Sequence, residues 1–197
     1  MSGQPSAPWV AYEQMQQMFS VQNLDNDLDT IPDEIDVLLL VHPKALSEAT
    51  LFAVDQFVLG GGKLLAFIDP MAESDESMEA MIEGMADGKA SDLGPLLAAW
   101  GVDYDPERAV LDARLGMSVS RGQGQLPARH IGWLEVEADY MNHDDTVIAP
   151  LQLLTVASAG ALQPLAESST QFIPLLSSSN NSALVPSSSF TNLPDPE

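Results

Sequence analysis

The chain of 197 residues contains no cysteine and only seven lysine and arginine residues, against 29 aspartate and glutamate residues. Without cysteine it cannot form disulfides, ligate zinc or iron–sulfur clusters through sulfur, or use a thiol nucleophile. The formal net charge of −22 disfavours nucleic acid as a partner, because phosphate backbones are bound by basic side chains. The simplest interpretation of this negative charge is that it keeps the protein soluble. The alternative, more specific interpretation is that the protein binds a cationic ligand or partner.

Long apolar runs are also missing. No run of about eighteen apolar residues occurs, so no segment of the sequence is predicted to span a membrane. The first residues, from Met1 to Pro5, lack the charged start and the apolar stretch of a signal peptide. These features indicate either a cytoplasmic protein or a soluble piece of a longer one.

The stretch from Ile35 to Pro70 is predicted to form one β-α-β unit. Residues 36–41 have the length and apolar composition of a buried strand, and residues 64–68 form a second one. Ser47 is a good N-cap for the helix between them, and the glycines at 60–62 end that helix. Two apolar strands joined by one helix should be parallel, and both faces of such a sheet are normally covered.

This unit predicts an α/β fold with three layers around a mainly parallel sheet. We expect a single sheet–helix core that contains Leu38, Leu40, Phe57, Leu65 and Phe67. Residues 1–176 are assigned to this α/β domain. Residues 177–197 are rich in serine, asparagine and proline, which predicts a loop or tail that is dispensable for folding and that continues into a longer parent protein.

His42 and Asp69 are the candidate ligand-binding residues. Each follows a predicted strand of the β-α-β unit, and ligands of open α/β sheets bind outside the carboxyl ends of the strands. His42 can donate a hydrogen bond to a ligand and Asp69 can accept one. The plainer alternative is that both side chains brace their loops, because each stands beside a proline.

No catalytic residue, metal ligand or cofactor is predicted. The sequence has no Gly-x-Ser-x-Gly elbow and no dinucleotide fingerprint. The glycines before Lys63 follow a helix and precede a strand, which is the reverse of the order in a phosphate-binding loop. The sequence therefore favours a protein that is not an enzyme.

The motif DVLLLVHPKALSEATLFAVDQFVLGGGKLLAFIDP, residues 36–70, resembles the soluble domain of the GldG-like auxiliary proteins of ABC-type transport and gliding-motility systems. The likeness lies in a strand that ends in His-Pro, a helix of the pattern LS-x-x-T-L-x-A-x-D-Q-F, a Gly-Gly turn, and a strand that ends in Asp-Pro. It covers most of residues 8 to 180 and is looser after Asp87. It implies a flavodoxin-like or glutamine-amidotransferase-like fold.

The same resemblance implies a non-catalytic accessory domain of an ABC-type export or gliding-motility system, which binds a partner subunit or an extracellular ligand. It implies a periplasmic location, at the extracytoplasmic face of the inner membrane, with membrane contact only through helices of a longer parent protein. The implied partners are the permease and ATPase subunits of the same system. Two alternatives stay open: a degenerate amidotransferase-like hydrolase that uses His42 and Asp69, and a small-ligand or sugar sensor at the strand ends.

Overall fold

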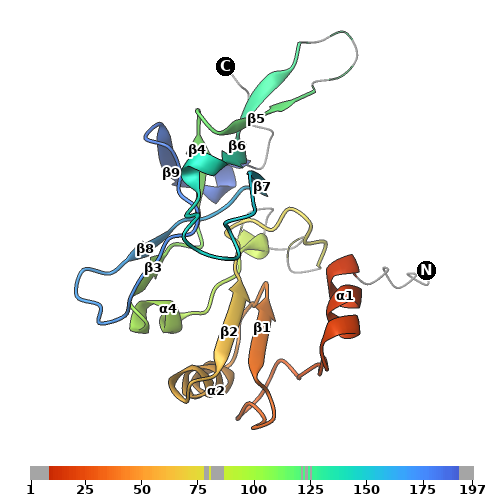
Figure 1. Cartoon of the computed structure of the whole chain (residues 1–197), viewed down its shortest axis with the longest axis vertical. Coiled ribbons are helices and arrows are strands. Elements are labelled where there is room, and N and C mark those ends of the chain that lie inside the picture. Colours follow the sequence, from red (N-terminus) through yellow and green to blue (C-terminus); the bar gives the residue numbers. More distant parts are fainter. Residues whose placement is uncertain are drawn as a thin grey trace.

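The computed structural model describes residues 9–77, 80, 87–120, 122, 124 and 126–190. Its helices are α1 (Val10–Met18), α2 (Glu48–Leu59) and α4 (Pro95–Ala99), with 3-10 turns η1 (Asp87–Lys89), η2 (Ala138–Tyr140) and η3 (Ser187–Phe190). Its strands are β1 (Val37–Val41), β2 (Lys63–Phe67), β3 (Val102–Tyr104), β4 (Arg108–Asp112), β5 (Gly116–Val119), β6 (Ala128–Glu137), β7 (Leu153–Ala157), β8 (Leu162–Pro164) and β9 (Ser182–Pro186). Figure 1 shows β1, β2 and α2 at one end of the molecule and the β4–β7 and β9 strands toward the other.

The β-α-β unit forms as predicted. β1 and β2 pair in parallel along their whole length. Ser47 caps α2, because its side chain accepts a hydrogen bond from the backbone N–H of Thr50 at 3.2 Å. Gly61, just past the end of α2, has a φ of +94°, a conformation that glycine adopts without steric cost. Local signals therefore determine this part of the fold.

The prediction of a three-layer, mainly parallel, flavodoxin-like or amidotransferase-like sheet was wrong. β3 pairs with β8, β4 with β9, and β6 with both β5 and β7, and all of these ladders are antiparallel. The protein is a mixed α/β structure with small, mostly antiparallel sheets. Parallel pairing needs a crossover of about a dozen residues or more, usually a helix. The described connections from β4 to β9 contain no α-helix, and neighbouring strands there pair antiparallel.

The expected core is only partly correct. Leu38 is buried beneath α2, and Leu40 and Phe57 pack against the same cluster. Leu65 and Phe67, in contrast, are 51% and 56% exposed. Successive side chains of a strand point to opposite faces, and α2 covers only one face of this two-stranded sheet. The prediction was therefore wrong for the two residues that lie on the other face.

The segment after residue 177 contains regular structure that the sequence did not predict. Residues 182–186 form β9, which pairs with β4. Phe190 in η3 is buried and packs with Met71 and Ala109. The expectation of a plain loop or tail is thus corrected for these residues. The division of the chain at residue 176 is a separate claim, and it stays a prediction.

Candidate functional site

His42 lies immediately beyond the carboxyl end of β1, with a left-handed φ of 51°. Its Nε2 is 3.2 Å from Oδ2 of Asp75, and the Lys44 ammonium donates to the same carboxylate oxygen. The hydrogen bond from Lys44 is the main reason why the pKa of Asp75 lies well below its ordinary value. The three side chains form a compact charged group that ties the loop after β1 to the loop after β2.

Asp69 lies beyond the carboxyl end of β2, and its contacts are local. Its Oδ1 accepts a hydrogen bond from the backbone N–H of Met71 at 2.7 Å, and its own N–H donates to Oγ of Ser91 at 2.9 Å. Burial raises the pKa of Asp69, although the Met71 hydrogen bond and nearby His42 oppose this shift. The carboxyl group of Asp69 therefore braces the turn after β2.

Residues that the sequence did not single out complete the strand ends. Tyr104, at the end of β3, donates its hydroxyl hydrogen to the backbone carbonyl of Ser91 at 3.1 Å. Burial raises the pKa of this phenol, and the charge of Asp69 raises it further. Neither Tyr104 nor Asp75 belongs to a recognisable sequence motif. The fold, and not closeness in the sequence, brings these two residues to the strand ends. Only Lys44, two residues after His42, lies close enough in the chain to be suggested by position.

Among the described residues, one polar atom of this group has no hydrogen-bond partner. Nδ1 of His42 is buried and makes no hydrogen bond to the described residues. A neutral imidazole presents one donor and one acceptor nitrogen, and here Nε2 faces Asp75. The remaining nitrogen is Nδ1, so its hydrogen-bonding capacity is unused within the described chain.

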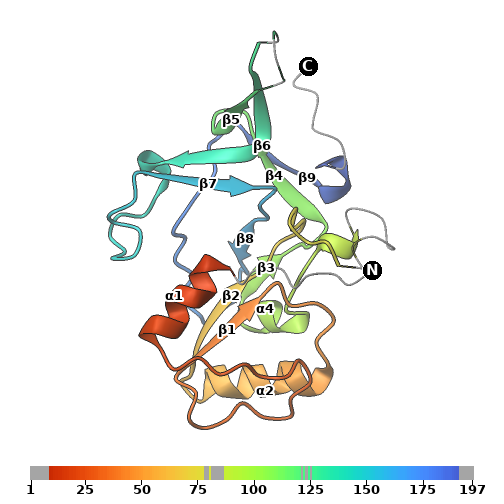
Figure 2. The same ribbon diagram turned by 90° about the vertical axis from the view of Figure 1, so that its right-hand side faces the viewer.

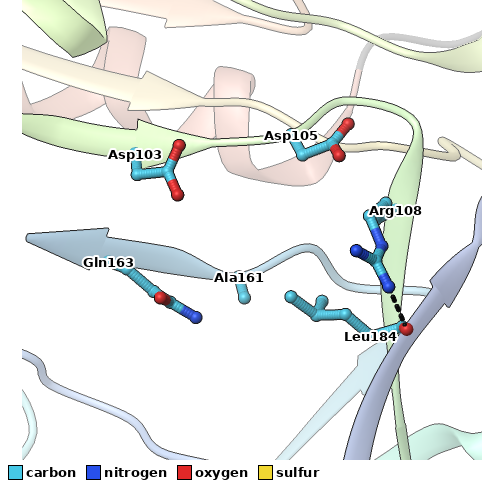
Figure 3. A pocket seen from close by; sticks show the side chains of 6 residues that line it. All are labelled: Asp103, Asp105, Arg108, Ala161, Gln163 and Leu184. Carbon is cyan, nitrogen blue, oxygen red and sulfur yellow. Dashed lines mark hydrogen bonds between the residues drawn. The ribbon is translucent and has the colours of Figure 1, made fainter. Parts of the chain in front are cut away.

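A separate small hollow of about 30 Å³ is lined by Asp103, Asp105, Arg108, Ala161, Gln163 and Leu184. Figure 3 shows these side chains, with Arg108 hydrogen-bonded to the backbone carbonyl of Leu184 at 2.6 Å. Arg108 thereby links β4 to β9. The lining does not include His42 or Asp69, so the hollow is distinct from the predicted strand-end site.

One side of the β-α-β unit carries exposed apolar side chains. Val37, Leu39, Val41, Leu65 and Phe67 lie on the side of the β1–β2 sheet that α2 does not cover, with the exposed Lys63 opposite Val37 at one end, and we call this surface the open face. Leu39 stands opposite Leu65 and Val41 opposite Phe67 in the parallel register. All of these side chains are exposed except Leu39, which is half-buried.

Helix α1 leaves the open face exposed. In Figures 1 and 2 the β1–β2 sheet lies between α1 and α2, so α1 is on the side of the open face. However, α1 contains no buried residue, and its flanking Trp9 and Phe19 are 66% and 65% exposed. The described chain thus presents two apolar surfaces on one side of the β-α-β unit.

A family model described as an ABC-type uncharacterized transport system matches residues 1–197. The chain belongs to this family of ABC transport auxiliary proteins. Searches of curated proteins and of solved structures found no match. The auxiliary family confirms the relationship predicted from residues 36–70 at the level of the ABC transport system.

Two further findings describe this auxiliary protein. Within residues 9–77, 87–120 and 126–190, no helix has both the length and the apolarity to cross a bilayer. Among the same described residues, no group of three or more histidine or acidic side chains is placed to hold a metal ion. The described features that are candidates for a function are the paired charges at the strand ends and the open face.

Proposed function

We propose that this auxiliary protein is a non-catalytic accessory domain, and that it binds the permease or ATPase subunits of its ABC-type transport system. The observation that carries the proposal is the open face. Parallel strands are almost always covered on both faces, and here one face carries apolar side chains that the described chain leaves uncovered. Contiguous exposed apolar surface of this kind marks interaction sites.

The open face offers enough free energy to support association. Full burial of one valine, leucine or phenylalanine side chain is worth about 1.5–3 kcal/mol. Because the side chains of the open face are about half exposed, covering them yields roughly 4–7 kcal/mol before the entropic cost of association. That amount suits an accessory contact within a larger assembly.

The strand-end charges support a role other than catalysis. A general base works best when its pKa lies near the operating pH. The Asp75 carboxylate is instead stabilised in its charged form, chiefly by the hydrogen bond from Lys44. Asp69 is engaged by the backbone of Met71. Side chains that pair with each other in this way are suited to fixing loops.

Finer aspects of this function rest on the resemblance of residues 36–70 to GldG-like proteins. These aspects are an export or gliding-motility role and a periplasmic position at the extracytoplasmic face of the membrane. Any membrane attachment would then come through helices of a longer parent protein. Such a position suits a domain that contacts the outer side of a permease.

The binding proposal is tested with the purified protein and the permease–ATPase complex of the same system in detergent. We expect saturable binding that Phe67→Ser weakens roughly four- to tenfold, because covering the exposed half of one phenylalanine is worth about 0.8–1.5 kcal/mol. Phe52→Ser is the matched control, since Phe52 is 62% exposed but lies on α2. Absence of binding, or equal loss in both variants, would refute the proposal.

A second candidate function, a small-ligand or sugar sensor, is favoured by the unpartnered Nδ1 of His42. On this hypothesis a neutral monosaccharide hydroxyl fills the missing hydrogen bond. Calorimetric titration with a panel of neutral monosaccharides should then show binding that His42→Phe abolishes. Lys63→Met, at the opposite end of β2, is the control and should leave the affinity unchanged. No heat of binding from any sugar in the panel would reject this function.

A further inference from the structure

We propose that the open face receives an amphipathic α-helix with basic flanks, supplied by a partner subunit. This inference rests on the proposed function and specifies the chemistry of the partner. It differs from an extended segment that pairs with a strand edge, because such a segment would leave the face itself uncovered. The apolar side chains lie on the face, so the occupant must lie across it.

The dimensions of the open face fit one helix. A strand rises about 3.3 Å per residue, so the ladder from Val37 to Val41 is about 16 Å long. A helix rises 1.5 Å per residue, so roughly eleven residues, or three turns, span this length. α2, which covers the opposite face of the same two strands, has twelve residues. A helix of similar length therefore matches the open face.

Acidic residues at one border of the open face set the charge of the partner. Asp33, Glu34 and Asp36 immediately precede β1, and all are exposed. Lys63, paired with Val37 at the same end, offsets one of these three negative charges, so the border stays acidic. Lysine or arginine at one end of the incoming helix would complement them. One such exposed pair adds only about 0.2–1 kcal/mol, but several together favour a basic over an acidic helix at low salt, and they also orient the partner and speed its association. The acidic border thus favours one direction for the bound helix.

The net charge also argues against other occupants. A second copy would bring another charge of −22 toward the first, which opposes association through the same surface. An anionic membrane surface is repelled for the same reason. A basic amphipathic helix is complementary both to the apolar side chains of the open face and to its acidic border.

The test uses two synthetic helical peptides of about fourteen residues, with the same leucine stripe at helical spacing. One peptide carries lysines at its ends, and the other carries glutamates at the same positions. We expect the full chain to bind the lysine peptide at least tenfold more tightly, as measured by fluorescence anisotropy at low salt. Phe67→Ser should weaken this binding roughly four- to tenfold, and Phe52→Ser should leave it unchanged.

A second variant separates charge from apolar contact. Combined Asp33→Asn, Glu34→Gln and Asp36→Asn substitutions should reduce the preference for lysine over glutamate while binding persists. Equal binding by the Phe67→Ser and Phe52→Ser variants would mean nonspecific attraction of acidic protein and basic peptide, and would overturn the proposal.

Other occupants give distinct results, and each of them overturns the proposal. A dimer that sedimentation equilibrium detects and Phe67→Ser abolishes would identify a second copy. Phe67-dependent binding to vesicles of phosphatidylcholine would identify lipid. Peptide binding that appears only after deletion of residues 1–20 would identify α1 as the cover. If neither peptide binds but the permease–ATPase complex binds in a Phe67-dependent manner, the proposed accessory function is supported. Only the proposal that the partner supplies a basic amphipathic helix is then refuted.

Discussion

A chain that ends at Ser178 should lose at least about 5 kcal/mol of unfolding free energy relative to the full chain. The deletion removes β9, which pairs with β4 along its whole length, and leaves β4 without this partner strand. It also removes Phe190, which is 8% exposed and packs with the fully buried Ala109. Loss of a buried phenylalanine alone costs about 3–5 kcal/mol. The melting temperature should fall by roughly 10–20 °C.

The contact made by Phe190 is close enough to be tested alone. A Cβ atom placed on Gly132 in β6 would lie 2.0 Å from Cε1 of Phe190, so the ring rests directly on the glycine backbone. Phe190→Ala should therefore cost about 3–5 kcal/mol in chemical denaturation, even if the shorter chain fails to fold. A chain that ends at Phe190 keeps the described contacts of this segment and is the matched control. Unchanged stability of the Phe190→Ala variant would show that the segment is dispensable, as its composition alone suggests.

The sequence predicted the β-α-β unit because its signals are local. Ser47 meets its hydrogen-bonding partner three residues on, and Gly61 supplies the positive φ where α2 ends. The apolar runs of the two strands were recognisable for the same reason. Those runs also led to a wrong prediction of burial. An apolar residue in a strand looks the same in the sequence whether its side of the sheet is covered or exposed. The sequence thus predicted two covered faces, and Leu65 and Phe67 show that the described chain covers one.

The antiparallel sheets were not predicted because their pairing is not local. β4 meets β9, and β3 meets β8, across long intervening segments. The strand β3 has only three residues, and β9 stands between serines and asparagines that typically mark loops. What fixes β9 is its contact with β4 and the burial of Phe190, neither of which leaves a periodic pattern. Sequence periodicity therefore cannot reveal these ladders.

In the candidate site too, local features were predictable from the sequence and contacts between distant residues were not. The positions of His42 and Asp69 at the strand ends follow from the β-α-β pattern. Their partners do not, because Asp75 is one acidic residue among 29, and Ser91 is one serine among many. Tyr104 reaches this group only because β3 places it there. Local sequence thus identifies where a strand ends, while the fold decides what surrounds that end.

Asp112 is the buried carboxylate on which the C-terminal segment depends. It is fully buried at the end of β4. Its Oδ1 accepts hydrogen bonds from the backbone of Arg114 at 2.8 Å and Leu115 at 3.0 Å, and from the Ser179 hydroxyl at 2.7 Å. Its Oδ2 accepts one from the backbone N–H of Ser179 at 2.6 Å. One side chain therefore joins the turn between β4 and β5 to the segment that leads into β9.

Replacement of Asp112 should be strongly destabilising. We expect Asp112→Ala to cost about 3–5 kcal/mol in urea denaturation, because each buried donor loses its acceptor. Asp112→Asn should cost about 2–4 kcal/mol, since an amide hydrogen would face the backbone N–H of Ser179. Asp105→Asn is the matched control: Asp105 also accepts a backbone hydrogen bond in a turn, but it is exposed. That variant should change stability by less than about 0.5 kcal/mol.

The pH dependence of the Asp112→Asn variant provides an independent check. Burial acts to raise the pKa of Asp112, but the hydrogen bonds from Ser179, Leu115 and Arg114 outweigh it and hold the pKa below the ordinary 3.8. The folded carboxylate thus stays ionised at a pH where the unfolded one is protonated. Its stabilisation is complete above the ordinary pKa and is lost as pH falls through the folded pKa. The stability gap between the wild type and Asp112→Asn should therefore narrow from about pH 5 to pH 2. A gap that stays constant over this range would show that Asp112 does not titrate with folding.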